Sequence, residues 1–580
     1  MGTASYQGGG PPPSYAWGVY LSPLFPHDKI AASFLPSSCI LQSKQSSFVI
    51  NISLLVKVTV TVVDLLIEAS VPDTTYRFPN PSSHRAMTLK DSEVHVRHWQ
   101  NLRLSLTLSS SLQGTIGKLS DYILLTIFRY YLDASPRNWP KLVHICRRWR
   151  RITFASQRSL HLRLFCTSGA PVLETLSVWP ALPIVVQYGG SPSSNSNPPV
   201  PPVPEDEDNI VAALKQFDRV HSIILNVTKP LLEKLSAIRR PFSELENLTL
   251  QYDDDVPLTI SSELSSAFRW GPRLRNLYLS WVAIPALPRL LFLSTALVNI
   301  QLHGISNVGY ISPEAFANAL SGMPRLRTIS LHFLSSAPYP DYTVLPLPRE
   351  RVTLLALKKL KYRGTSKYLD SLAARIDAPR LGNVDITFFS QPPPMDCPQL
   401  GQFINRFAMH HSHRRADILF SENATSISFT QPELPTRLEL QVSCESFAQQ
   451  LENMIRICNC LYSFLSCIEH LRVCATRPTS VRHYNHYWHE MWQSLLRIFR
   501  GTKWAYVACG HWTSIIIAAL RQSCFPSLHK LCIPEPHPPW RKTVESFIQS
   551  RLISGHFIAV EYERSRMNGH HGTGTAFFQR

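Results

Sequence analysis

A leucine-rich pattern recurs at nearly regular spacing across residues 242–386, and it restricts the possible folds more than any other feature of the chain. Six segments place apolar residues as L-x-x-L-x-L or close to it, and a similar segment begins earlier, at Val220. The central residues of the six are 29, 23, 29, 31 and 24 residues apart. Because alternate residues of a strand share a face, each L-x-L pair predicts a short strand with one buried face. These central residues are Leu248, Leu277, Ile300, Ile329, Leu360 and Val384.

This spacing resembles that of leucine-rich repeats, whose units are about 20–29 residues long. The runs between the segments have a helical composition, as in residues 313–320. The resemblance therefore implies the α/β fold class, with an irregular solenoid whose concave face is a parallel sheet. The pattern weakens after about residue 400 and returns in residues 468–475 and 525–533. We expect one repeat domain over residues 209–560.

A proline-rich segment precedes this domain. Residues 191–204 read SPSSNSNPPVPPVP, and four acidic residues follow them. Such a composition cannot pack, so it predicts an extended linker over residues 191–208. Of the 580 residues, 44% are hydrophobic and 17% are charged, which excludes a wholly disordered chain. Composition also predicts a poorly ordered, low-complexity region over residues 1–115 and a flexible tail, rich in Gly, His and Arg, over residues 561–580.

A short helical segment precedes the linker. Apolar residues between Ile123 and Tyr131 follow an i, i+1, i+4, i+5, i+8 stripe, and either Ser120 or Asp121 can cap the first turn. A second helical run begins at Trp139. Apolar side chains occupy more faces of these helices than so small a unit can bury alone. The excess must contact the rest of the chain or another protein.

At these residues the chain resembles an F-box. That family begins with Leu-Pro-Asp/Glu and closes on Val-Cys-basic-x-Trp, where this chain has LSDYILLTIF and WPKLVHICRRWRRITF. The resemblance covers residues 116–158, with one departure, because Ser120 replaces the usual proline. This replacement would weaken adaptor binding without destroying the helix. The connecting segment 159–190, which contains WPALPIVV, is similar to the segment after the F-box in a large group of F-box proteins of mushroom-forming fungi.

The resemblance implies a substrate-recognition subunit of an SCF-type cullin–RING ubiquitin ligase. The F-box would bind a Skp1-type adaptor, and through it the cullin and RING subunits, while the repeat domain would bind an unknown target protein. It further implies no enzymatic activity. Twelve cysteines without a C-x-x-C pair, and no signal peptide, favour reduced thiols in the cytoplasm or nucleus. We expect no cofactor and no metal. The adaptor-binding residues, carried over by position, are Leu119, Ser120, Ile123, Leu124, Ile127, Leu142, Val143, Ile145, Cys146 and Trp149.

The chain is basic, with 58 Lys and Arg residues against 40 Asp and Glu residues, a formal net charge of +18. Much of the excess lies between Lys118 and Arg163. A solvated basic rim that steers an acidic adaptor is favoured over nucleic-acid contact there. Two other functions stay open: a leucine-rich interaction scaffold without a ligase role, and a nucleic-acid-binding protein whose affinity would fall steeply with salt.

Motifs for catalysis, metal binding and membrane insertion are missing or weak. No P-loop, G-x-S-x-G, H-E-x-x-H or G-x-G-x-x-G sequence occurs, and no C-x-x-C pair could form the zinc sites of a RING. His483, His486 and His489 lie at spacings that are more typical of a helix surface than of a zinc site. Charged residues interrupt the apolar stretch 48–71, whose alternating valines predict a strand rather than a membrane span.

Overall fold

The computed structural model describes residues 118–168, 170–189, 204–236, 238, 240–253, 257–259, 272–284, 287–334, 350–389, 396–408, 414–431, 434–475, 486–510, 512–521, 525–534 and 538–563. The region 1–115, including the strand expected within residues 48–71, lies outside them. The chain divides into two compact units. The first comprises Met1–Tyr131 with Ile145–Arg147, and the second comprises Leu132–His144 with Arg148–Arg580.

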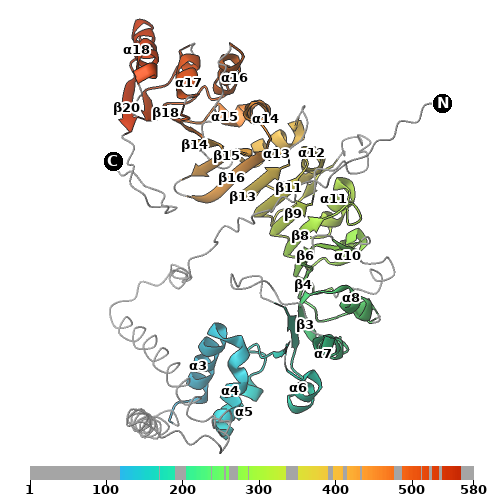
Figure 1. The fold of residues 1–580 in the computed structure, drawn as a ribbon. Helices are drawn as coiled ribbons and strands as arrows, with labels where there is room; N and C mark the ends of the chain where they lie inside the picture. The colour runs from blue at the N-terminus through green and yellow to red at the C-terminus, as the bar shows by residue number, and fades with distance from the viewer. Residues whose placement is uncertain are drawn as a thin grey trace, which may run out of the picture. The chain divides into compact units, whose positions relative to one another are not determined.

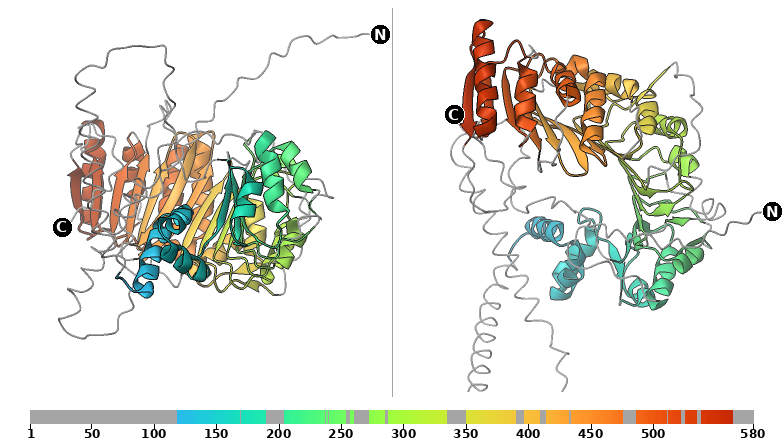
Figure 2. Two further views of the ribbon diagram at one scale, coloured as in Figure 1. Left: turned by 90° about the horizontal axis from the view of Figure 1, so that it is seen from below. Right: turned by 45° about the horizontal axis from the view of Figure 1, so that its top comes forward.

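One large, mostly parallel sheet runs through the second unit, so the expected α/β class is confirmed (Figure 1). Figure 2 shows its strands lying side by side in an almost sequential order. Over the described residues the sheet has sixteen strands. In spatial order they are β1 (Leu164–Thr167), β2 (Ile184–Tyr188), β3 (Val220–Asn226), β4 (Asn247–Gln251), β6 (Asn276–Ser280), β8 (Asn299–Ile305), β9 (Thr328–Phe333), β11 (Lys359–Gly364), β13 (Asn383–Phe388), β16 (Leu434–Ser443), β15 (Ala424–Gln431), β14 (Arg415–Phe420), β17 (His470–Ala475), β18 (Trp504–Ala508), β19 (Lys530–Pro534) and β20 (Ala559–Glu563).

The six central residues of the repeat pattern lie in one row across the sheet. Leu248 is the register partner of Leu277, which in turn pairs with Ile300, and the row continues through the remaining three. Each of them is at most 2% exposed. The predicted strands and their buried faces are therefore confirmed. Residues 164–188, expected as part of a connection, supply the first two strands of the same sheet.

Helices cover one face of this sheet within the second unit (Figure 1). The run expected to be helical at residues 313–320 forms α11 (Pro313–Ser321), whose first turn is capped by Ser312. The other helices after residue 170 are α6 (Val172–Val178), α7 (Pro204–Leu214), α8 (Lys229–Ser236), α10 (Leu287–Leu293), α12 (Ser366–Ala373), α13 (Pro398–Ala408), α14 (Phe447–Cys460), α15 (Tyr462–Leu465), α16 (His486–Leu496), α17 (Trp512–Leu520) and α18 (Pro538–Ile553). Two small ladders pair β5 (Leu258–Thr259) with β7 (Val282–Ala283), and β10 (Val352–Thr353) with β12 (Ile376–Asp377).

The sheet departs from the expected parallel arrangement at β15, which is antiparallel to both β14 and β16. The cause is the length of the connections. A parallel crossover needs about a dozen residues or more, whereas only Ser421 to Asn423 join β14 to β15. The Ser421 N–H donates to the Ala424 carbonyl at 2.8 Å and closes this turn.

The linker expected over residues 191–208 is wrong at its acidic end, because α7 begins at Pro204. Lys234 Nζ lies 3.0 Å from both the Glu207 and the Asp208 carboxylates, and Thr228 Oγ1 donates to Glu207 Oε1 at 3.0 Å. Acidic side chains near a helix N-terminus are also stabilised by the helix dipole. The acidic run therefore has a helical role. Residues 190–203 lie outside the described part.

The tail expected over residues 561–580 is likewise wrong at its start, because β20 continues to Glu563. Lys530 Nζ lies 2.6 Å from Glu561 Oε1, so an ion pair joins this last strand to β19. Residues 564–580 are not described.

Gly401, inside α13, provides a test of helix packing in the second unit. A Cβ at this position would lie 2.3 Å from the Cys460 carbonyl oxygen at the end of α14. Ala normally stabilises a helix interior by about 1 kcal/mol relative to Gly. Here we predict that Gly401→Ala lowers the free energy of unfolding by about 1–3 kcal/mol, because the two helices must separate.

Urea unfolding followed by circular dichroism measures the effect. The control is Gly322→Ala, because a Cβ at position 322 has no neighbour closer than 3.7 Å. A Gly401→Ala protein as stable as the unmodified chain would contradict this account of the α13–α14 contact.

Candidate functional site

Helix α3 (Asp121–Ala134), which begins the segment that resembles an F-box, has a capped first turn. The Ile123 N–H donates to Ser120 Oγ at 3.4 Å, and the Leu124 N–H donates to the Ser120 carbonyl at 3.1 Å. Asp121 lies in the first turn, where the helix dipole favours a carboxylate. Ser120, one of the two residues predicted as caps, accepts this backbone bond with its side chain. The residue that replaces the family's proline therefore helps to start the helix.

Apolar side chains occupy two opposite faces of α3. Leu124, Ile127, Phe128 and Tyr131 are buried, each at most 3% exposed. The opposite face is accessible and contains three large side chains. They are Tyr122, Ile123 and Tyr130, which are 79%, 40% and 53% exposed.

We call this accessible surface the α3 outer face and define it as Tyr122, Ile123, Thr126 and Tyr130. At about 100° per residue, these four positions fall within one sector of the helix. Thr126 Oγ1 donates to the Tyr122 carbonyl at 3.0 Å, so its methyl and hydroxyl stay close to the helix axis. Sequence reasoning missed Tyr122 and Tyr130. The signal was their eight-residue spacing, which places them beside Ile123 on one face.

The ten predicted adaptor-binding residues fall into two groups by exposure. Five are accessible, with Leu119 and Ile145 half-buried and the other three exposed: Leu119, Ser120, Ile123, Ile145 and Cys146. Five are buried, each at most 3% exposed: Leu124, Ile127, Leu142, Val143 and Trp149. In this conformation the buried five stabilise the helices from within and are not available to a partner.

The two groups also differ in where they lie. All five accessible residues belong to the first compact unit, together with Leu124 and Ile127. The three remaining buried residues, Leu142, Val143 and Trp149, belong to the second. The first unit therefore holds every accessible member of the predicted set.

Helices α4 (Trp139–Ile145) and α5 (Arg147–Ala155) are joined at Cys146, and a 3-10 turn (η1, Pro136–Asn138) precedes them. Within the second unit, Trp139 Nε1 donates to the Arg163 carbonyl at 2.6 Å, and its ring meets the Trp179 ring edge-on at 4.8 Å. Arg150 Nε donates to the Val143 carbonyl at 2.9 Å. The WPALPIVV segment thus supports α4, and at least one arginine of the basic cluster has a structural contact.

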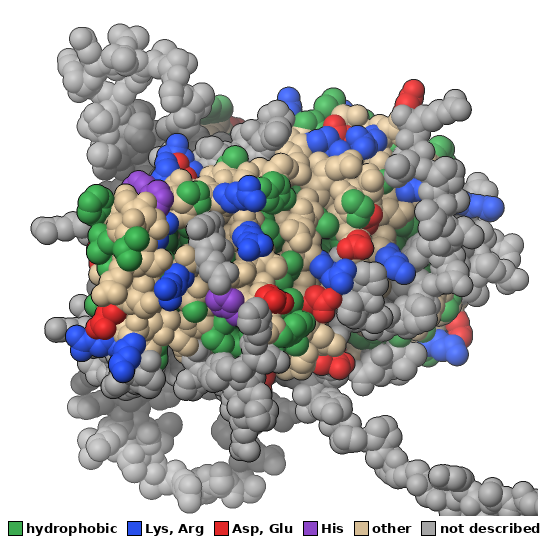
Figure 3. Space-filling view, turned by 90° about the horizontal axis from the view of Figure 1, so that it is seen from above, with side chains coloured by type: hydrophobic (Ala, Val, Ile, Leu, Met, Phe, Trp, Pro, Cys, Tyr) green, Lys and Arg blue, Asp and Glu red, His purple; other side chains and the backbone are tan. Residues whose placement is uncertain are grey.

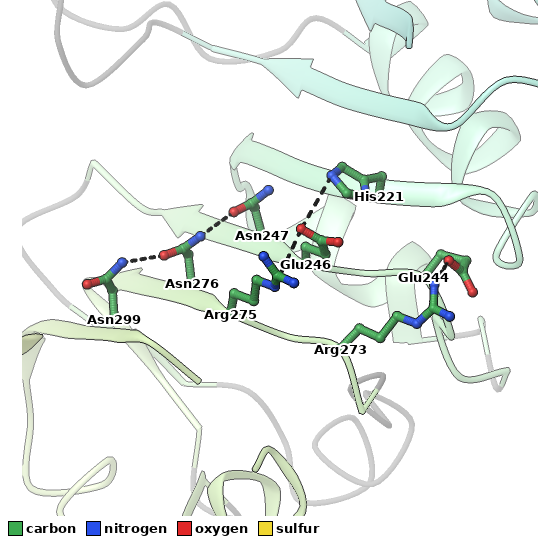
Figure 4. A network of polar contacts seen from close by, with 8 residues as sticks. All are labelled: His221, Glu244, Glu246, Asn247, Arg273, Arg275, Asn276 and Asn299. Carbon is green, nitrogen blue, oxygen red and sulfur yellow. Dashed lines mark hydrogen bonds and ion pairs between the residues drawn. The ribbon is translucent and has the colours of Figure 1, made fainter. Parts of the chain in front are cut away.

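The second candidate surface is the open face of the sheet, which we define as the strand side chains that point away from the buried L-x-L residues. A ladder of asparagines crosses it (Figure 4). Asn299 Nδ2 donates to Asn276 Oδ1, and Asn276 Nδ2 donates to Asn247 Oδ1. Each Asn directly precedes an L-x-L pair, a repeated signal in the sequence that the pattern analysis passed over.

Ion pairs flank this ladder (Figure 4). Glu246 Oε2 lies 3.8 Å from both His221 Nε2 and Arg275 Nε, and Arg273 pairs with Glu244. Burial, with Arg163 nearby, lowers the pKa of His221 despite the Glu246 carboxylate. His221 is therefore mainly neutral at pH 7, and its half-buried ring is a polar neighbour of Glu246 rather than a charged one.

Two histidines and a serine form a polar cluster on the open face. Ser330 Oγ lies 3.2 Å from His303 Nε2 and 3.3 Å from His332 Nε2, and the two imidazoles stack at 4.1 Å. Burial, then Lys361, lowers the pKa of His303 to about 4. Burial, then His303 and Arg363, lowers that of His332 to about 3. Both rings are neutral at pH 7, which is what permits them to stack.

Basic and acidic side chains alternate over much of the second unit. Arg437 lies 2.6 Å from Glu439, and Lys503 lies 2.7 Å from Glu469. On the face seen in Figure 3, Lys and Arg side chains are scattered, with Asp and Glu side chains between them. The charge of +18 is therefore not gathered into one stripe on that face.

A cavity of about 660 Å³ lies among α13, α14 and α16. Arg456 lines the cavity, and its guanidinium lies 2.9 Å from the Glu452 carboxylate and 3.6 Å from the Asp396 carboxylate. Cys460 also lines the cavity, and burial raises the pKa of its thiol. A neutral thiol beside a paired arginine gives no activated nucleophile here.

Metal-ligating clusters and membrane-spanning helices were sought in the described ranges. There, no three His, Cys, Asp or Glu side chains come together as metal ligands would. His489 contacts Gln493 at 3.0 Å, and His483 lies outside the described residues. No helix in these ranges has both the length and the apolar character needed to cross a bilayer.

No protein-family model matches this chain, and no curated protein is significantly similar to it.

The stacked histidines predict a specific loss of stability in acid. Because their pKa values are lower in the folded chain than the usual 6.5, the unfolded chain binds more protons between about pH 6.5 and pH 3. The stabilisation is complete above this window and is lost as the pH falls through it. At about 1.4 kcal/mol per pKa unit, the two lowered pKa values correspond to a loss of roughly 6–8 kcal/mol once both rings are protonated, measured by urea unfolding across the window.

The double variant His303→Gln, His332→Gln should lose correspondingly less stability over the same range. His556→Gln, at an exposed position, is the control and should follow the unmodified chain. If the free energy of unfolding fell equally with pH in the double variant and the unmodified chain, these two rings would not be the cause of the acid sensitivity.

The asparagine ladder gives a second prediction. Asn276 makes two side-chain bonds within the ladder, so we expect Asn276→Ala to lower the free energy of unfolding by about 1–3 kcal/mol. Asn299→Ala removes one of these bonds and should cost about half as much. Thermal unfolding of both variants tests the order, and equal stabilities would contradict this account of the ladder.

Proposed function

We propose that this chain is the substrate-recognition subunit of an SCF-type cullin–RING ubiquitin ligase. In this proposal the F-box-like residues 116–158 bind a Skp1-type adaptor, and the repeat domain holds a target protein in the cytoplasm or nucleus. The chain itself is not an enzyme. Catalysis comes from the ligase partners, and the receptor contributes proximity by raising the effective concentration of target lysines near the charged ubiquitin.

The observation that carries the proposal is the α3 outer face. Aromatic side chains are enriched in the energetic centres of protein interfaces, and this face exposes Tyr122 and Tyr130 beside Ile123. The accessible Ile145 and Cys146 belong to the same compact unit. Exposed apolar groups gathered on one helix are more typical of a docking surface than of a free surface.

The aligned strands support the second half of the proposal. Units of 23–31 residues place one aliphatic residue each into a common buried row. This arrangement is typical of leucine-rich repeats, whose sheet face and loops serve as binding surfaces. We therefore assign target binding to the repeat domain.

A second candidate is a leucine-rich interaction scaffold without a ligase role. Two observations favour it: Ser120 replaces the family's proline, and half of the carried-over docking residues are buried. Both functions use the repeat domain, so they differ only in whether an adaptor binds.

Calorimetry with the full chain and a purified Skp1-type adaptor decides between them. We expect the double variant Ile123→Asp, Tyr130→Asp to weaken adaptor binding about 100-fold or more, because buried hot-spot positions each contribute about 2 kcal/mol or more. Ser120→Pro restores the family's residue and should tighten binding.

The matched control is Leu173→Asp, which changes a 71% exposed leucine on α6 and should leave adaptor binding unchanged. If the unmodified chain does not bind the adaptor, the ligase role is wrong and the scaffold remains. If it binds and the α3 double variant binds equally well, the outer face is not the docking surface.

A further inference from the structure

Strand β11 presents three cations in a row on the open face. Lys359, Lys361 and Arg363 alternate with Leu360 and Tyr362, which are at most 1% exposed on the opposite face. The three span five residues, or about 13 Å at the usual strand rise. Arg363 is exposed, and the two lysines are half-buried. Their positive charge is therefore fixed on the sheet rather than spread over flexible loops.

The neighbouring strands supply little negative charge to this row. In register with it on β9 are Thr328, Ser330 and His332, and on β13 are Asn383, Asp385 and Thr387. Asp385 is the one carboxylate in that set, and its Oδ2 lies 3.4 Å from Lys361 Nζ. Among the described residues, no carboxylate lies within ion-pair distance of Lys359 or Arg363.

The pKa values of the groups in and beside the row reflect its excess of positive charge. Burial, then repulsion from Lys361, lowers the pKa of Lys359 despite Asp385. The same cations help to lower the pKa values of His303 and His332, so both rings stay neutral. The guanidinium of Arg363 lies over the Phe389 ring at 5.8 Å, which limits its motion.

Three other cations differ from Lys359 and Arg363 because each has a close acidic partner. Arg437, Lys503 and Lys530 lie 2.6–2.7 Å from Glu439, Glu469 and Glu561 respectively. Glu439 is also the register partner of Asp385, so carboxylates bound the cationic row on its β16 side. A long polyanion that ran across the sheet would meet these carboxylates. The short row fits a few acidic side chains better than a nucleic-acid backbone.

We propose that Lys359, Lys361 and Arg363 on β11 bind an acidic, extended segment of a partner protein across the open face. Carboxylates of that segment pair with Lys359 and Arg363, beside the neutral imidazoles of His303 and His332. Identifying this partner as a ubiquitination target rests on the proposed function. The binding of the acidic segment does not.

Fluorescence anisotropy with the full chain and a short labelled peptide of alternating Glu and Ser residues tests the proposal without adaptor. We expect the triple variant Lys359→Gln, Lys361→Gln, Arg363→Gln to weaken binding about tenfold or more. The control triple variant Arg437→Gln, Lys503→Gln, Lys530→Gln removes the same net charge from paired positions and should change binding less than about twofold. Asp385→Asn removes the one local carboxylate and should tighten binding about two- to fivefold.

Equal losses in the two triple variants would overturn the proposal, because net charge alone would then explain binding. An equivalent Gln-Ser peptide that bound as tightly as the acidic peptide would overturn it too. An oligothymidylate that bound more tightly than the acidic peptide, and lost that binding in the β11 variant, would assign the row to nucleic acid. No adaptor is present in this assay, so a negative result does not bear on adaptor docking. A chain that did not bind the adaptor could still bind the acidic peptide.

Discussion

A row of buried aliphatic side chains sets the register on which the second unit depends. Each of the eight neighbouring strands from β3 to β16, in their order across the sheet, contributes one of them. The row runs through Ile223, Leu248, Leu277, Ile300, Ile329, Leu360, Val384 and Leu438. A slip of one residue in any strand would turn its aliphatic side chains onto the open face and bury its polar ones. The spacing of the repeats varies, and the connections absorb the variation so that the row stays aligned.

The open face follows from this row. Because Leu360 and Tyr362 point to the core, Lys359, Lys361 and Arg363 must point the other way. The same constraint brings His303 and His332 onto adjacent strands, where they stack as neutral rings. The polar chemistry of the sheet is thus a consequence of how the core aligns, and residues far apart in sequence become neighbours at fixed positions.

The core strands could be predicted from the sequence because each L-x-L pair is a local signal. The antiparallel β15 could not, because its direction depends on the short turn at Ser421–Asn423 rather than on its own composition. The start of α7 could not be predicted because prolines and acidic residues are typical of a linker. Thr228 and Lys234, which bind the acidic Glu207, lie on a later segment. For the docking residues, the helical pattern identified α3, but burial decides which side chains a partner can reach. A stripe of apolar residues does not distinguish the buried Ile127 from the exposed Ile123.

We propose that an adaptor docks on the α3 outer face while the sheet stays free for a target. Hydrogen–deuterium exchange of the full chain, with and without a Skp1-type adaptor, tests this most directly. We expect slower exchange over residues 121–131 and 145–147 when the adaptor is present, with unchanged exchange in β9, β11 and β13. Protection that falls on these strands instead, or no protection over α3, would contradict it.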